Sequence, residues 1–364
     1  MFKRLLAVVL WLLLPPSATP AGSVYLVRDL TPDIGQYAQV NAISCCGTLA
    51  GISAGEAFTW NPQAGYTRLA VPDGATRCGA NSLNSSGIAA GWAQDGYGYG
   101  HAVVWNADGS YRLLQNPTGA KSAVARSINS SGHVVGVAIF EETASLGAPP
   151  AIGYHLAIWD PDGSVQDLGL LSILHTVDTI LDDGRIYGRI AGPRIFWIRN
   201  TDGVTTETHA DVEDYSEYNN ISASGLIAGC FQTAPDAPCN AAIWNTDGTL
   251  HSILPPLSST DDLCDAYDIN SGGFAVGESS IRGGYPSIDA CLWMPDGTPV
   301  ALPTIAGTVY SRAQLINAAG WIVGECGMDI GSRTVLWTPV SEPSGFVVIA
   351  LGIAALRGLR KHTI

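Results

Sequence analysis

A short pattern recurs seven times along this chain and constrains its fold more than any other feature. An apolar residue is followed four positions later by a glycine and four positions after that by a second glycine, as in Ile128, Gly132 and Gly136. A tryptophan follows each copy, at Trp60, Trp105, Trp159, Trp197, Trp244, Trp293 and Trp337. These tryptophans are 38 to 54 residues apart, which is the spacing of four-stranded propeller blades. The sequence therefore predicts an array of seven similar units.

Each unit has the pattern of four antiparallel strands. In the third unit, alternating apolar residues predict strands over residues 122–128, 133–138, 155–159 and 165–168. The tight turns 129–132 and 160–163 join these strands in pairs, because Asn or Asp begins each turn and a glycine ends it. The aspartates of the second turn lack the twelve-position ligand pattern of a calcium loop. One unit is therefore a meander closed by tight turns.

A single meander leaves its outer edges open, so units of this size stack around an axis. The sequence thus predicts an all-β, seven-bladed propeller of four-stranded antiparallel meanders over residues 22–340. The seventh unit ends soon after Trp337 without a fourth strand, whereas residues 24–30 form a strand-like segment without a unit. We expect this N-terminal strand to complete the last blade and close the ring. The repeat tryptophans should pack between blades and bury ~150 to 250 Å² each.

The first 21 residues have the composition of a secretory signal. Lys3 and Arg4 precede an apolar run from Leu5 to Leu14, and prolines and small residues follow it. The alternative, a retained anchor, is disfavoured because the run is about half of what spans a ~30 Å hydrocarbon core. We expect cleavage after Ala21, with Ala18 as the alternative, and export of the rest.

Residues 341–364 have the composition of a second sorting signal. The motif Ser341-Glu342-Pro343 precedes an apolar run from Gly345 to Leu356 and a basic end. This order resembles the PEP-CTERM sorting tail of bacterial exported proteins, with a serine at the first proline of the motif. The resemblance implies an exosortase-type processing enzyme as partner and a place at the cell surface or outside the cell. The basic end of the hydrophobic helix should stay cytoplasmic, so this helix is the only expected membrane contact. A plain amphipathic helix is the alternative.

The repeat itself resembles the HAF repeats of bacterial extracellular proteins. The segments that carry the resemblance precede the tryptophans, as in His101-Ala102-Val103-Val104-Trp105 and His155-Leu156-Ala157-Ile158-Trp159. The resemblance covers residues 38–338. The fourth unit departs from it, with Leu181 at the asparagine position and residues 193–196 before its tryptophan. The family implies an exported repeat protein and no defined chemistry.

The charge of the predicted propeller limits the kinds of molecule that it can bind. Residues 22–340 hold 13 Lys and Arg and 31 Asp and Glu, a formal charge of 13 − 31 = −18. This excess of acidic residues disfavours nucleic acid as a partner, because phosphate binding needs a basic face.

All eight cysteines lie in residues 22–340, and an even number of cysteines in an oxidising compartment predicts disulfides. The expected pairs are Cys230 with Cys239 and, second, Cys264 with Cys291. The Cys-x-x-Cys spacing of a zinc site is absent.

Two sets of residues in the long connections are candidate sites, since such loops lie on the edge opposite the tight turns. Trp92, Tyr97 and Tyr99 would stack on sugar rings, unless they only pack on neighbouring blades. Asp211, Glu213, Asp214 and Glu217, with Asp261 and Asp262, would bind a hard cation such as calcium or a basic partner. A solvated acidic loop is the alternative, and no other cofactor is expected. The longest connection is predicted between Ala138 and Tyr154.

Evidence for catalysis in the sequence is weaker. Residues 51–55 match Gly-x-Ser-x-Gly, but here they enter a hairpin and not the strand-to-helix elbow that this motif needs. The sequence therefore favours a non-catalytic surface or matrix protein, with exopolysaccharide or another surface component as its expected partner. A glycoside hydrolase or lyase is the alternative, although no spacing identifies a carboxylate pair. An enzyme would need convergent carboxylates with raised pKa in the central funnel, whereas a binder needs exposed aromatic side chains.

Overall fold

The computed structural model describes residues 25–142, 151–171, 176–190, 195–209, 216–234, 237–281 and 288–340. Contacts divide the chain into two units, Val27–Thr338 and a second made of Met1–Leu26 and Pro339–Ile364. The expected signal peptide (1–21), the sorting motif Ser341-Glu342-Pro343 and the C-terminal hydrophobic helix lie outside the described residues. Within the described ranges, no helix has both the length and the apolar character needed to cross a bilayer.

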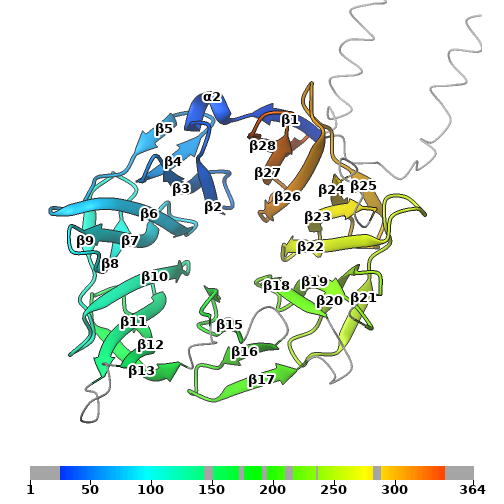
Figure 1. Cartoon of the computed structure of the whole chain (residues 1–364). Coiled ribbons are helices and arrows are strands. Elements are labelled where there is room, and N and C mark those ends of the chain that lie inside the picture. Colours follow the sequence, from blue (N-terminus) through cyan, green and yellow to red (C-terminus); the bar gives the residue numbers. More distant parts are fainter. Residues whose placement is uncertain are drawn as a thin grey trace, which may run out of the picture. The chain divides into compact units, whose positions relative to one another are not determined.

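Residues 27–338 form a seven-bladed β-propeller, as the repeats predict (Figure 1). Blade one holds β2 (Gln39–Ile43), β3 (Leu49–Ser53), β4 (Glu56–Asn61) and β5 (Gly65–Arg68). Blade two holds β6 (Ala75–Leu83), β7 (Ala89–Asp95), β8 (Gly100–Trp105) and β9 (Tyr111–Leu113). Blade three holds β10 (Ser122–Ile128), β11 (Val134–Glu142), β12 (Ala151–Trp159) and β13 (Val165–Leu171).

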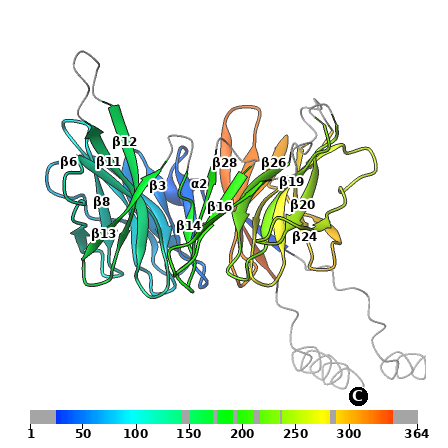
Figure 2. The same ribbon diagram turned by 90° about the horizontal axis from the view of Figure 1, so that it is seen from below.

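The next three blades repeat this order of four antiparallel strands. Blade four holds β14 (Thr179–Ile180), β15 (Ile186–Ile190), β16 (Ile195–Arg199) and β17 (Thr205–His209). Blade five holds β18 (Glu217–Ile221), β19 (Ile227–Phe231), β20 (Asn240–Trp244) and β21 (Leu250–Ile253). Blade six holds β22 (Leu263–Ile269), β23 (Ala275–Ser280), β24 (Ile288–Trp293) and β25 (Pro299–Ala301). Seen edge-on, the strands run between the two rims of the ring (Figure 2).

The seventh blade is completed by the N-terminal strand, which confirms the predicted closure. It holds β26 (Tyr310–Ile316), β27 (Ile322–Gly327) and β28 (Ser332–Pro339), with β1 (Tyr25–Asp29) beside β28. After β1, the Leu30 amide donates to the Thr334 carbonyl at 2.9 Å, and the Leu30 side chain is fully buried. The one-turn helix α2 (Thr31–Ile34) was not expected from the pattern. The two ends of the propeller sequence thus share one sheet.

The two glycines of the repeat are required for different physical reasons. The first ends the tight turn: Gly132 has φ 87° and donates to the Asn129 carbonyl at 3.1 Å. The second lies in the second strand of the blade, against a carbonyl of the first strand. A Cβ on Gly136 would overlap the Val124 carbonyl oxygen, and a Cβ on Gly277 would overlap that of Asp265. Only glycine fits where these backbones approach so closely.

The repeat tryptophans are buried and connect neighbouring blades. In the described part of the chain, four indole N–H groups donate to a carbonyl that follows the fourth strand of the preceding blade. These are Trp105 to Ala70 (2.8 Å), Trp159 to Gln115 (2.7 Å), Trp293 to Pro255 (2.7 Å) and Trp337 to Pro303 (2.6 Å). These four tryptophans therefore both fill the core and satisfy polar backbone groups between blades.

Two predictions need correction. The connection between Ala138 and Tyr154 is shorter than expected, because β11 and β12 continue as a hairpin in which Ile139 pairs with Tyr154 and Glu141 with Ile152. Residues 143–150 of this connection lie outside the described residues.

The second correction concerns the disulfides. Cys230 and Cys239 are bonded, with their Cα atoms 5.8 Å apart. Cys264 and Cys291 are free and buried, so the predicted second disulfide is wrong. Strand β23 lies between the strands that carry them, so these strands are about 9 to 10 Å apart, which is too far for a disulfide.

Candidate functional site

The innermost strand of most blades carries a β-bulge with a polar residue. Strands β2, β6, β10, β18, β22 and β26 lie nearest the middle of the ring (Figure 1). In these six described strands the register shifts by one residue, two positions before the apolar residue of the repeat. The bulged residues are Asn41, Asn81, Arg126, Asn219, Tyr267 and Gln314, and none of them is buried. Bulges re-aim side chains and are common beside functional sites.

Three carboxyl groups converge at the inner strands of blades five and six. Glu217 begins β18, Asp265 lies in β22, and Glu278 in β23 is the cross-strand partner of Asp265. The bulged Asn219 donates from Nδ2 to Asp265 Oδ1 at 2.8 Å. The three line a cavity of about 270 Å³. Its other lining residues are Cys230, Gln232, Ala237, Cys239 and Leu263. We call Glu217, Asp265 and Glu278 the acidic cluster.

The members of the acidic cluster are held in different electrostatic states. Burial, and then the neighbouring charges of Glu217 and Glu278, raise the pKa of Asp265 to about 7. Glu278 instead has a cation beside it, because Arg312 of blade seven donates from Nε to Glu278 Oε2. Burial and the same Glu278 raise the pKa of Tyr267. Asp265 can therefore hold or release a proton near neutral pH, whereas Glu278 is held in an ion pair with Arg312.

The raised pKa of Asp265 predicts a pH dependence of stability. An aspartate in the unfolded chain has a pKa of about 3.9, so this group binds its proton more tightly in the fold. Its contribution to stability is present at low pH and is lost as pH rises through about 7. The chemical-denaturation midpoint should fall between pH 5 and pH 8, and it should fall less in Asp265→Asn.

Part of this slope should survive in the variant, because burial also raises the pKa of Asp268 to about 7. Equal slopes in the variant and the natural chain would show that Asp265 titrates normally.

The three aromatic side chains of the predicted sugar-binding set do not stack on one another. Trp92 lies in β7 opposite Gly79, and its indole ring covers that glycine. Tyr97 and Tyr99 lie in the following turn, where their amides donate to Asp95 Oδ1, and their exposed fractions are 91% and 42%. Within residues 89–105, all of which the structure describes, no ring contact joins any two of these three aromatic side chains. All three belong to blade two and not to the blades of the acidic cluster.

Of the predicted acidic loop, only Glu217 is described. It belongs to the acidic cluster at the start of β18, whereas Asp211, Glu213 and Asp214 lie outside the described residues. Asp261 accepts a hydrogen bond from Ser279 at 2.6 Å, and Asp262 is exposed. No group of three or more His, Cys, Asp or Glu side chains with metal-binding geometry occurs within the described ranges.

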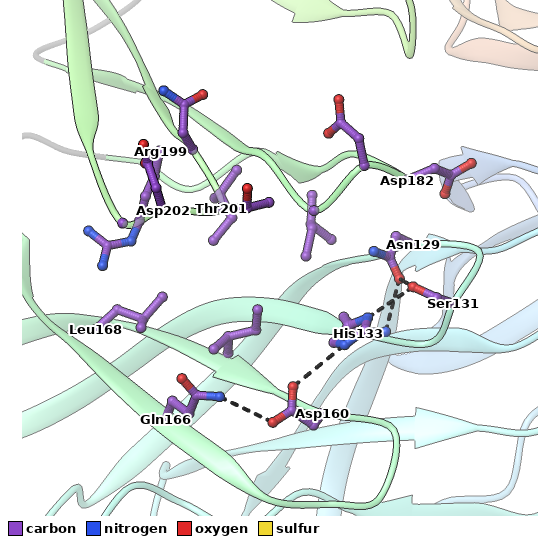
Figure 3. Close-up of a pocket in the computed structure, with 17 residues that line it drawn as sticks. Asn129, Ser131, His133, Asp160, Gln166, Leu168, Asp182, Arg199, Thr201 and Asp202 are labelled. Carbon is purple, nitrogen blue, oxygen red and sulfur yellow. Dashed lines mark hydrogen bonds and ion pairs between the residues drawn. The ribbon is translucent and has the colours of Figure 1, made fainter.

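A larger cavity, of about 530 Å³, lies between the tight turns of blades three and four (Figure 3). Blade three contributes Asn129, Ser131, His133 and Asp160, and blade four contributes its two turns around Asp182 and Asp202. We call this cavity the blade 3–4 groove. It lies at the rim of the tight turns.

Three residues in this groove lie in a row but do not form a catalytic triad. His133 Nδ1 is 2.9 Å from Ser131 Oγ, and its Nε2 is 3.6 Å from Asp160 Oδ1. Ser131 donates its one hydroxyl proton to Asn129 Oδ1 at 2.9 Å, so it accepts a hydrogen bond from His133. His133 is therefore not placed to take a proton from Ser131, as a triad requires.

No protein-family model matches the sequence, and no curated protein is similar to it. Solved structures with a similar fold include a streptogramin B lyase, with 11% identity over 87% of this chain and 98% of that chain (TM-score 0.49). A puromycin hydrolase has 14% identity over 86% of this chain and 52% of that chain (0.49). A gluconolactonase from Xanthomonas campestris has 14% identity over 89% of this chain and 93% of that chain (TM-score 0.38). Similarities this weak transfer no activity to the present chain.

Proposed function

We propose that this chain is an exported bacterial surface or matrix propeller that binds an extracellular polysaccharide at the middle of the ring without catalysis. The observation that carries this proposal is the convergence of Glu217, Asp265 and Glu278 on one cavity beside the bulged Asn219. Carboxylate and amide groups pair well with sugar hydroxyls because each offers more than one hydrogen-bonding position. The formal charge of −18 over residues 22–340, from 13 basic and 31 acidic residues, favours a neutral or cationic polymer over a polyanion.

Export is supported by the sequence at both ends and by the cysteines. The signal-like residues 1–21 and the sorting-like residues 341–364 fit transport across the inner membrane, followed by handling by an exosortase-type enzyme. The Cys230–Cys239 disulfide fits an oxidising compartment. In this proposal the membrane is touched only through the C-terminal hydrophobic segment.

The direct test uses residues 22–340, produced oxidised in a periplasm and mixed with the extracellular polysaccharide of the host. Co-sedimentation with the polymer and release of reducing ends are scored together, with calcium or with a chelator. We expect co-sedimentation without release. Loss of binding in chelator would support the predicted calcium role of Asp211, Glu213, Asp214 and Glu217. Absence of co-sedimentation would refute the proposed partner.

One observation favours a second function, a polysaccharide hydrolase or lyase. Asp265, with its pKa raised to about 7, has the property of a general acid, and Glu217 has no cation paired with it among the ion pairs of the described residues. Glycosidases divide acid and base roles between neighbouring carboxyl groups whose surroundings differ in this way. In that case reducing or unsaturated ends would be released, and Asp265→Asn would abolish the release while leaving co-sedimentation in place.

A further inference from the structure

We propose that the blade 3–4 groove is a second binding site, specific for a small aliphatic amine in its cationic form. This site is separate from the acidic cluster and does not depend on the function proposed above. Its volume of about 530 Å³ falls within the range of small-molecule sites, ~300 to 1,000 Å³.

The groove combines an aliphatic floor with a carboxylate rim. Ile158, Leu168, Ile180 and Ile186 provide apolar lining. Asp160, Asp182, Asp183 and Asp202 provide the carboxylates. A methylene chain that ends in an ammonium group matches both, because its stem needs apolar contact and its head needs oxygen acceptors. Among the described residues, the lining has no Phe, Tyr or Trp ring on which a sugar would stack.

The charge of the groove favours a cation. Arg185 pairs with Asp183 at 2.8 Å, and Arg199 is the other guanidinium at the site. Figure 3 shows Arg199 beside Asp202, whereas Asp160 and Asp182 lie toward His133. Four aspartates against two arginines leave a formal charge of −2 with His133 neutral. An anionic ligand would be repelled.

The carboxylates keep acceptor positions for a ligand. Asp182 Oδ1 accepts from the Ser130 amide at 2.8 Å. Asp160 Oδ2 accepts from Ser164 Oγ at 3.0 Å and from Gln166 Nε2 at 3.2 Å. An ionised carboxylate has about four acceptor positions, so both groups retain capacity toward an ammonium group.

The neighbouring groove is a control built into the molecule. The corresponding groove between blades two and three has a volume of about 290 Å³, and no carboxylate lines it. Counted from the repeat positions, Asn106 stands there for Asp160, Ser130 for Asp182 and Ser131 for Asp183. The acidic rim is therefore a property of blades three and four and not of the tight turn itself.

One side chain explains why the two grooves differ in size. Arg112 of blade two reaches across its groove and donates to the Pro161 carbonyl of blade three at 3.4 Å. The repeat position of Arg112 is occupied in blade three by Gln166, which donates to Asp160 of its own blade at 3.2 Å. Because Gln166 is shorter and turned back, the blade 3–4 groove stays open.

The test titrates residues 22–340 with 1,5-diaminopentane by calorimetry at ~0.15 M salt, with 1,5-pentanediol as the uncharged ligand of equal length. We expect saturable binding of the diamine and none of the diol. Asp160→Asn with Asp182→Asn should weaken binding at least tenfold. Asp247→Asn is the control, because Asp247 lies in a tight turn of blade five outside the groove, where it accepts a hydrogen bond from the Thr249 amide. This variant should bind the diamine as the natural chain does.

A further variant keeps every carboxylate. Gln166→Arg should close the groove as Arg112 closes its neighbour, and it should abolish diamine binding in a chain that still unfolds cooperatively. Any of three results would overturn the site: no heat with the diamine, equal weakening by Asp247→Asn, or unchanged binding in Gln166→Arg.

Discussion

A chain that begins at Thr31 should lose at least about 3 kcal/mol of unfolding free energy, because it lacks the strand that completes the last blade. Leu30 is fully buried, and deleting a buried leucine side chain alone costs ~2 to 5 kcal/mol. The truncation also leaves the Thr334 carbonyl without its donor from Leu30 and exposes an edge of the seventh sheet. Denaturant unfolding followed by tryptophan fluorescence measures the loss.

Two controls separate closure of the ring from mere shortening. Leu26 is 64% exposed in β1, so Leu26→Ala should stay within about 0.5 kcal/mol of the natural chain. A peptide of residues 22–30 added to the truncated chain should raise its denaturation midpoint, because the peptide can take the vacant edge. An unchanged midpoint in the truncated chain would show that β1 does not hold the ring.

Gly277→Ala should destabilise the propeller by about 3 kcal/mol or more, although it adds one methyl group. The added Cβ would overlap the Asp265 carbonyl oxygen, which belongs to backbone and cannot rotate away. Strands β22 and β23 would have to separate, and overpacking of this kind costs ~1 to 3 kcal/mol even where side chains yield. The same measurement of unfolding free energy applies.

Gly96→Ala is the matched control for this substitution. No atom lies within contact distance of a Cβ built on Gly96, and its φ is not positive. It should therefore unfold like the natural chain. A small effect of Gly277→Ala would mean that the second repeat glycine is dispensable and that the close approach of the strands is not required.

Much of the fold was predictable because each turn and each interface between blades requires a particular residue type, which then recurs in every repeat. Gly132 ends a turn at positive φ, and Trp159 fills the interface with the preceding blade, so each leaves its mark in every copy. The closing role of β1 followed from counting strands. The lengths of β11 and β12 did not follow, because a hairpin extension and a loop have similar composition. The Cys264–Cys291 pairing failed because spacing in sequence ignores the strand between them.

The acidic cluster was not predicted, because it depends on neighbouring blades and on register. The sequence predicts a site at Glu217 from its acidic neighbours in sequence, whereas in the fold Glu217 lines a cavity with Asp265 and Glu278 of the next blade. The raised pKa of Asp265 comes from burial, which no spacing reveals. One signal was available: a polar residue stands two positions before the repeat apolar residue in every copy, as Asn219 does before Ile221. The sugar-stacking role of Trp92, Tyr97 and Tyr99 stays a prediction.

The most direct test of the proposed site compares polysaccharide binding by two sets of variants. The first combines Glu217→Gln with Asp265→Asn, and the second combines Tyr97→Ala with Tyr99→Ala, both in residues 22–340. If the polymer binds at the middle of the ring, the first set should lose at least tenfold in co-sedimentation affinity while the second keeps most of it. Unchanged binding in the first set and loss in the second would contradict the account and place the ligand on the loops of blade two.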